Sequence, residues 1–320
     1  MKTSIKLIYT ILSLLLLTIS CKENNSNTKD YEIGFFDERS MSFKVLDIER
    51  NTIKEIVKIE DENSGWNRKI SWSPNGEEFG FTGIVKGIPG THIYTIDKGT
   101  TRTVMETNNY DIKNKEKELQ FWHPDGYLIH HFKWHSKGDA GIYSVSLDGK
   151  IKDITRNEGK YWDYFPNLYP DGRIGYFSIN KTEKSPVNKY YEINLDGAVK
   201  KEIGQIEKMD TPLFSSTISK DLKSMFIGEE GEIYQYIFHT KELKNLTNTP
   251  NIYELGVSLS NDGNSIIYSR SETPNRDPMK SDNPTMNIYR MSLKSLDVEQ
   301  ITFGDNYFTF PSFRPVHNKT

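Results

Sequence analysis

The stretch FWHPDGYLIHHFK, residues 121–133, has the pattern of two β-strands joined by a tight turn. Aromatic and apolar residues lie on both sides of an Asp-Gly pair, which is a strong short-range signal for a turn between antiparallel strands. The stretch and the residues just after it hold four of the seven histidines of the chain: His123, His130, His131 and His135. Recurrence of this hairpin elsewhere in the chain would predict a repeat fold. The positions of the histidines on the strands decide whether they can form a metal site.

The hairpin recurs along the chain. Similar stretches are SWSPNGEEFGFTG, NLYPDGRIGYFSI, TISKDLKSMFIGE and SLSNDGNSIIYSR, which begin at Ser71, Asn167, Thr217 and Ser258, and a truncated copy, SFRP, begins at Ser312. The proline position of the copies is occupied by Pro74, Pro124, Pro170, Lys220, Asn261 and Pro315. A spacing of 41 to 54 residues between these positions indicates an internal structural repeat.

Each repeat contains further strand-like elements. A second series includes HIYTID at His92 and GIYSVSLDG at Gly141, and a third series closes the unit, as in KDIT at Lys152. Alternating β-branched and aromatic residues, interrupted by Asn-Gly and Asp-Gly, predict about four short strands in each unit. A repeat of about 40 to 50 residues with four strands is typical of a propeller blade. We therefore expect an all-β fold, a six-bladed β-propeller.

The first and last repeats are incomplete in complementary ways. Residues 31–60 contain three expected strands without the preceding Trp-Ser-Pro strand, and FPSFRP at Phe310 is a spare copy of that strand. We expect the C-terminus to supply the inner strand of the first blade, because closing the ring removes two exposed sheet edges. The alternative, an open array of hairpins, leaves both edges bare.

The motifs WSPNG, WHPDG and LYPDG, each followed by an Ile-Tyr or Tyr-Tyr strand, resemble the TolB-type propeller repeat, also called the WD40-like or PD-type repeat. The resemblance covers roughly residues 31–315 and implies a six-bladed propeller. The last two copies depart from the motif, as SKDLK and SNDGN show. TolB also has a smaller α/β domain before its propeller, whereas this chain has a short polar tether in that place.

The N-terminal segment is typical of a lipoprotein leader. Lys2 and Lys6 precede an apolar run over residues 7–19, which is shorter than the roughly 20 residues of a transmembrane helix and fits a secretory signal peptide. The run ends at Cys21, the single cysteine of the chain, in a segment that resembles a bacterial lipobox. The resemblance implies cleavage before Cys21 and a lipid on its sulfur; the alternative is a signal peptide with an incidental cysteine.

These features divide the chain into a signal peptide (residues 1–20), a lipidated tether (21–30) and the propeller (31–320). The formal charge is −3, and loss of the leader with its two lysines makes it −5. This balance disfavours nucleic acid as a partner, because phosphate binding requires clustered positive charge. We expect a location in the bacterial cell envelope, anchored to the membrane by lipid. Lys22 after the cysteine favours the outer membrane by resemblance to known sorting.

The repeat argues against a metal site in the histidine cluster. His130 and His131 are adjacent on a strand, so their side chains point to opposite faces of the sheet. His131 takes the place of a sheet-packing aromatic residue, and His123 falls at the turn. His123 and His135 lie at opposite ends of the second strand, too far apart to share an ion whose bonds to imidazole are about 2 Å long. We predict no metal ligand in this cluster.

The loops of a propeller blade can be sorted by topology alone. The blade-to-blade loops and the loops between the second and third strands share one face, and the Pro-Asp-Gly turns lie on the other. The first face is rich in aromatic residues, which suit contacts with a protein or a sugar. The predicted partner-binding residues are Trp66, Tyr110, Trp134, His135, Tyr161, Trp162, Tyr164, Tyr253, Tyr307 and Phe308. The alternative is that these side chains only fill the joints between blades.

No motif in the sequence indicates an enzyme. A Gly-x-Ser-x-Gly elbow, a His-Glu-x-x-His pair, a phosphate loop and a dinucleotide fingerprint are all missing from the sequence, so we predict no catalytic residue and no cofactor. Acidic pairs such as Asp61 with Glu62, or Glu158 with Asp163, have the residue types for glycoside chemistry. The expected function is binding of an envelope protein or peptide. The alternatives are a carbohydrate-binding or carbohydrate-active propeller, lyase-like or hydrolase-like, and a purely structural module.

Overall fold

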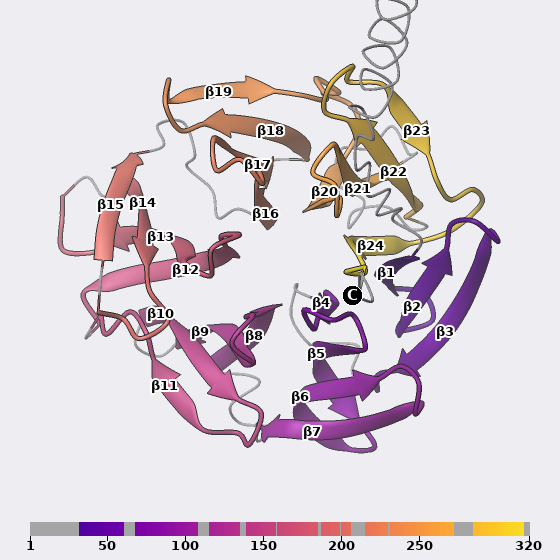
Figure 1. Cartoon of the computed structure of the whole chain (residues 1–320), viewed down its shortest axis with the longest axis horizontal. Helices are drawn as coiled ribbons and strands as arrows, with labels where there is room; N and C mark the ends of the chain where they lie inside the picture. Colours follow the sequence, from indigo (N-terminus) through magenta and orange to yellow (C-terminus); the bar gives the residue numbers. More distant parts are fainter. Residues whose placement is uncertain are drawn as a thin grey trace, which may run out of the picture.

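The computed structural model describes residues 32–60, 68–107, 115–134, 139–157, 159–184, 187–198, 200–205, 215–229, 231–271 and 284–316. In these ranges the regular structure is all β, as the repeats predict, and the strands are arranged in a ring around a central axis (Figure 1). No helix in the described part of the chain is long and apolar enough to cross a membrane. The predicted signal peptide, Cys21 and the tether lie outside the described residues.

The strands form antiparallel units of four, and the order within each unit runs from the innermost strand outward. The first unit is β24 (Phe308–Phe313), β1 (Glu32–Asp37), β2 (Ser42–Asp47) and β3 (Thr52–Lys58). The second is β4 (Ser71–Trp72), β5 (Glu78–Val85), β6 (Ile88–Thr95) and β7 (Thr100–Glu106). The third is β8 (Lys115–Trp122), β9 (Tyr127–Trp134), β10 (Asp139–Ser146) and β11 (Ile151–Asp153).

The remaining units continue around the ring in chain order. The fourth is β12 (Tyr161–Leu168), β13 (Ile174–Asn180), β14 (Asn188–Ile193) and β15 (Lys200–Gln205). The fifth is β16 (Ser215–Ile218), β17 (Ser224–Glu229), β18 (Glu232–Ile237) and β19 (Glu242–Asn245). The sixth is β20 (Glu254–Leu259), β21 (Ser265–Ser271), β22 (Met286–Ser292) and β23 (Val298–Gln300). A single parallel pairing, Ala140 with Trp162, joins the third and fourth units into one sheet.

Hydrophobic side chains join each unit to the next. The described residues contain six buried hydrophobic clusters, and each combines side chains of two neighbouring units. Phe43 of the first unit, for example, packs 4.7 Å from Phe81 of the second, measured between ring centroids. The last joint unites Ile267 of the sixth unit with Phe35 of the first. The core is therefore a series of joints around the ring.

The expected closure is confirmed. β24 pairs with β1 in antiparallel register, so the C-terminal strand is the innermost strand of the first unit. Arg314, just after β24, forms an ion pair with Glu32 and donates from Nε to the carbonyl oxygen of Gly76 at 2.7 Å. The indole nitrogen of Trp72 donates to the carbonyl oxygen of Ser312 at 3.3 Å. These contacts fasten the two ends of the described chain to the second unit.

Four innermost strands contain a bulge at the same level. The register shifts between Leu119 and Phe121 on β8, and again within β12, within β20 and where β24 faces β1. Three of the residues involved, Phe165, Gly256 and Phe310, have positive φ angles. A bulge bends its strand and turns a side chain in a new direction. The bulges therefore decide which side chains enter the axial channel.

Replacing Gly256 by alanine tests the bulge on β20. Gly256 has a φ of 78°, and a Cβ atom there would lie 2.8 Å from the Cα atom of Phe310 on β24. We expect a loss of about 3 kcal/mol in the free energy of unfolding, because backbone strain and a clash with β24 add together. Gly87 is a matched control, since its φ is 73° but a Cβ would meet nothing within 4 Å. Gly87→Ala should lower the free energy of unfolding by about 1 kcal/mol in the same urea titration. Equal losses for Gly256→Ala and Gly87→Ala would exclude a role for the contact with β24.

Candidate functional site

Six of the predicted partner-binding residues have described side chains. Tyr161, Trp162 and Tyr164 lie at the start of β12, and Phe308 is the first residue of β24. Tyr253 and Tyr307 come directly before β20 and β24. They thus lie at one end of the innermost strands, where the topology places them. Trp66, Tyr110 and His135 lie outside the described residues, and Trp134 is described only as part of the backbone of β9.

The described aromatic residues divide into two kinds. Tyr164 and Phe308 are only 5% and 4% exposed, and they pack in the joints between units. These two therefore fit the alternative in which the aromatic residues fill the joints. Tyr161, Trp162, Tyr253 and Tyr307 are partly exposed. The contribution of these four to a binding face stays a prediction.

Of the four acidic residues in the pairs on the same face, only Asp163 lies among the described residues. Asp163 is fully buried, and its carboxylate accepts hydrogen bonds from Ser178 Oγ at 2.6 Å and from Asn157 Nδ2 at 2.9 Å. Burial raises the pKa of this carboxyl above its usual value. Asp163 thus ties the third unit to the fourth. Glu158, Asp61 and Glu62 lie outside the described residues.

His130 and His131 lie as the repeat predicts. His130 is fully buried and its Nε2 lies 2.9 Å from Thr91 Oγ1 of the second unit, whereas the ring of His131 packs 6.1 Å from that of Phe165 in the fourth. Their side chains therefore point to opposite sides of the sheet. No group of three or more potential metal ligands occurs among the described residues.

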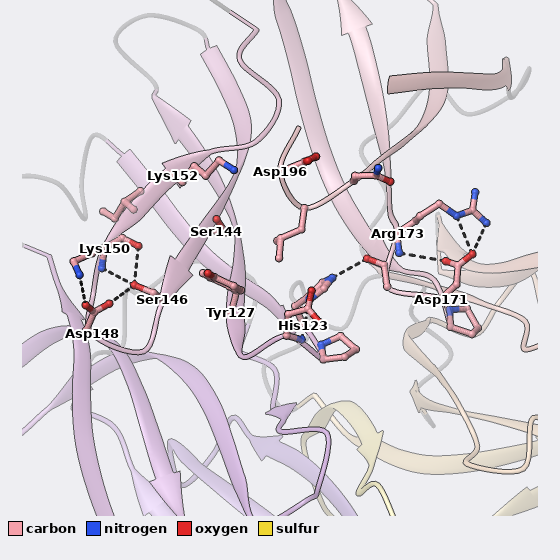
Figure 2. A pocket seen from close by; sticks show the side chains of 17 residues that line it. His123, Tyr127, Ser144, Ser146, Asp148, Lys150, Lys152, Asp171, Arg173 and Asp196 are labelled. Carbon is pink, nitrogen blue, oxygen red and sulfur yellow. Dashed lines mark hydrogen bonds and ion pairs between the residues drawn. The ribbon is translucent and has the colours of Figure 1, made fainter. Parts of the chain in front are cut away.

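A large cavity lies on the opposite face, among the Pro-Asp-Gly turns, where the sequence suggested only short turns. It is a cleft of about 950 Å³ between the third and fourth units. One side is formed by β9, β10 and β11, and the other by the turns at residues 170–173 and 194–196 (Figure 2). Tyr127, which is 37% exposed, supplies an aromatic surface. The volume lies within the range of small-molecule and peptide sites.

His123 forms the floor of the cleft and is fixed by two hydrogen bonds. Its Nδ1 accepts from the backbone N–H of Asp125 at 3.1 Å, so the ring proton lies on Nε2 and is donated to the carbonyl oxygen of Gly172 at 2.7 Å. This bond links the Pro-Asp-Gly turns of the third and fourth units. Both ring nitrogens are therefore used in holding the two turns together, and His123 is a structural residue of the cleft.

Some charged side chains of the cleft form ion pairs with each other, and others do not. Lys150 pairs with Asp148 at 2.7 Å, and Arg173 pairs with Asp171 at 2.8 Å. Among the described residues Lys152 has no carboxylate partner, and its side chain extends into the cleft (Figure 2). Across the cleft, Asp196 uses its carboxylate for the backbone N–H of Ala198 and otherwise faces solvent. The two walls thus present an unpaired cation and an accessible carboxylate to the same space.

Sequence reasoning missed this site, although its parts were visible. Tyr127, Lys152 and Asp196 each follow or belong to a repeated turn element, and topology places such turns on one face. Their convergence depends on how widely the third and fourth units separate at that end, and no sequence pattern encodes that separation.

A buried acid lies beneath the aromatic face. Glu254, at the start of β20, is 1% exposed, and no donor within the described structure meets its carboxyl oxygens with good hydrogen-bond geometry. The hydroxyl groups of Thr247 and Thr249 lie near enough to favour the charged form, but their effect on the pKa is smaller than that of burial. The nearest cation is Arg270, whose Nε lies 3.8 Å from Oε1. Burial raises the pKa of Glu254 to about 7. The carboxyl group therefore holds a proton in the folded protein under conditions where an exposed glutamate has lost it.

Glu254→Gln should change the pH dependence of stability. Because the folded protein binds this proton more tightly than the unfolded chain, the wild type loses stability as the pH rises from about 4.5 to about 7. The variant lacks this loss, so it should match the wild type near pH 4.5 and exceed it at pH 8 by about 3 kcal/mol. Urea titrations at both pH values measure the difference. The exposed Glu242→Gln is the control, and a pH-independent difference for Glu254→Gln would contradict the assignment.

No family model matches this sequence, and no curated protein matches it by sequence. Among solved structures, TolB from Acinetobacter baumannii aligns with a TM-score of 0.63 and 14% identity, over 89% of this chain and 67% of that one. A chain of a nidogen/laminin complex aligns with a TM-score of 0.62 and 12% identity, over 89% and 99%. An oligogalacturonate lyase in complex with manganese aligns with a TM-score of 0.50 and 10% identity, over 84% and 71%. At these identities the likeness concerns the fold alone: this chain has a TolB-like β-propeller fold.

Proposed function

We propose that this chain is a lipid-anchored module of the bacterial cell envelope, in the outer membrane, that binds a protein or peptide partner in the cleft between the third and fourth units. The leader and Cys21 support the location. The cleft carries the proposal of binding, because it combines an exposed aromatic ring with unpaired charges of both signs on facing walls. A peptide offers the matching groups: apolar side chains for Tyr127, a carboxylate for Lys152 and a cation for Asp196.

The aromatic face provides a second proposed contact surface. Tyr161, Trp162, Tyr253 and Tyr307 lie at the other end of the innermost strands and are partly exposed. A partner in the cleft leaves this face accessible, so the two surfaces can be tested separately. Trp162→Ala examines the face without changing any residue of the cleft.

A photo-crosslinking residue at position 127 tests the cleft in the lipidated protein. We expect p-benzoylphenylalanine in place of Tyr127 to yield one discrete adduct in living cells, because this side chain lies inside the cleft. Ile88 is the matched control, since it is 38% exposed against 37% for Tyr127 but lies on β6 of the second unit. Adducts of equal yield and pattern from both positions would show that the cleft has no special partner.

The charge reversal Lys152→Glu tests the chemistry of recognition. It should lower the yield of the adduct from position 127 about fivefold, because loss of an attraction and gain of a repulsion at a partly exposed site cost about 1 kcal/mol. The exposed Lys54→Glu on β3 changes the charge of the protein equally and should leave the yield unchanged. A glycan array and a reducing-sugar assay on the soluble domain test the alternative ligand. If the domain binds or cleaves a sugar and this depends on Lys152, the ligand of the cleft is a carbohydrate and not a peptide.

A further inference from the structure

The axial channel contains a second cavity that is independent of the cleft. It has a volume of about 240 Å³ and is lined by residues on or next to the innermost strands of all six units, β24, β4, β8, β12, β16 and β20. Most of its polar lining consists of hydroxyl groups, such as those of Ser71, Thr217 and Ser258. Lys69 is the single charged residue among those that line it. The cavity therefore places one ammonium group in an otherwise neutral, hydroxyl-bearing space.

The direction of Lys69 follows from its neighbours in the chain. The side chains of Ile70 and Trp72 both approach Gly34 in the first unit. Because side chains alternate along an extended chain, Lys69 and Ser71 point the other way, toward the third unit. Lys69 Nζ indeed donates a hydrogen bond to Oε1 of Gln120, on β8, at 3.1 Å. Lys69 and Ser71 thus present their polar atoms on the same side of the strand.

Within the described structure, the ammonium group of Lys69 has an incomplete set of partners. An ammonium group has three N–H donors, and the hydrogen bond to Gln120 uses one of them. No carboxylate of the described residues lies within ion-pair distance. Glu118 is the one charged group whose field reaches Lys69, and it does not line the cavity. Enclosure by the ring of strands lowers the pKa of Lys69 to about 8, although part of its surface stays open to the channel.

Two further groups point to a ligand. The hydroxyl of Ser71 is buried and has no hydrogen-bond partner within the described structure. The bulge on β8 makes Gln120 the extra residue between Leu119 and Phe121, and this brings its amide to Lys69. A buried charge is stable when it is paired, and a buried hydroxyl when it is hydrogen-bonded. Lys69 has N–H donors and Ser71 has an O–H donor without an acceptor, and one anionic oxygen acceptor can satisfy both.

We propose that the axial channel binds one small carboxylate group, held by the Lys69 ammonium group and the Ser71 hydroxyl. One negative charge balances the one cation of the cavity, and its two oxygens can accept from both donors. A cavity of 240 Å³ holds a group of a few heavy atoms and excludes a folded partner. The site is separate from the cleft, so the experiments below test it independently of the proposed function.

Calorimetric titration of the soluble domain with sodium acetate and sodium propionate tests the site. We expect binding by the wild type that weakens at least tenfold in Lys69→Met, which keeps the length of the side chain and removes its charge. The exposed Lys54→Met on β3 makes the same change outside both cavities and should bind like the wild type. The unfolding midpoint of Lys69→Met should not fall, since the variant removes an enclosed charge. Equal affinity of a folded Lys69→Met variant for acetate would overturn the proposal.

Proton linkage gives a second readout. A carboxylate beside Lys69 favours the ammonium form, so binding at pH 8 should take up protons, and the affinity for acetate should fall between pH 7 and pH 9.5. Titrations in buffers of different ionisation enthalpy measure this uptake. Binding without proton uptake at pH 8, and with the same affinity across this range, would exclude Lys69 as the anion ligand.

Matched ligands separate the sources of the carboxylate. Similar affinities for acetate and for a tripeptide with a free C-terminus assign the site to small free acids. At least tenfold tighter binding of the tripeptide, lost in Lys69→Met, assigns it to a chain terminus. Both outcomes support a carboxylate site. Acetamide and the tripeptide amide should not bind. Binding of these amides as tightly as the acids, or tighter binding of inorganic phosphate than of acetate, would overturn the assignment.

Discussion

The fold depends on the contact between its last strand and its first. β24 pairs with β1, and the joint between the sixth and first units buries Phe35, Ile267 and Phe308. Each unit buries one face of its sheet against the unit before it and the other against the unit after it, so a missing joint would expose two apolar faces and two strand edges at once. Closure is therefore the condition under which the other five joints can form.

The joints between units differ in polarity, and a large open space between two units lies at a polar joint. Between the first and second units the joint is aromatic, with Phe43 packed on Phe81. Between the third and fourth units the joint contains Asp163 with its hydrogen bonds at one end and His123 bonded to Gly172 at the other. Beyond His123 the two units separate and leave the cleft. The cleft thus lies at a joint that polar contacts hold at both ends.

The sequence predicted the fold in detail because the repeat has a simple physical basis. Tight turns need Asn-Gly or Asp-Gly, and strands alternate in the direction of their side chains, so WSPNG and WHPDG locate the same turn in different units. The same reasoning placed His130 and His131 on opposite faces and the spare strand at Phe310 inside the first unit. The exposure of the aromatic residues was harder to predict. Tyr164 and Phe308 occupy the expected end of the strands, yet their side chains are buried. Position along a strand is readable from sequence, whereas exposure depends on what the neighbouring unit presents.

By itself, the sequence determined the repeat, its four-strand unit, the closure by the C-terminal strand and the position of the single cysteine just after an apolar run. These features follow from local patterns of turn residues, alternation and hydrophobic length. Only the tertiary structure decided that Lys152 faces Asp196 across a cleft, that Lys69 is the one charged residue among the described lining of the axial cavity and that Glu254 is buried beside Arg270. These arrangements depend on the spacing and bulges of strands from different repeats. That spacing results from the packing of side chains far apart in the chain, which no local pattern records.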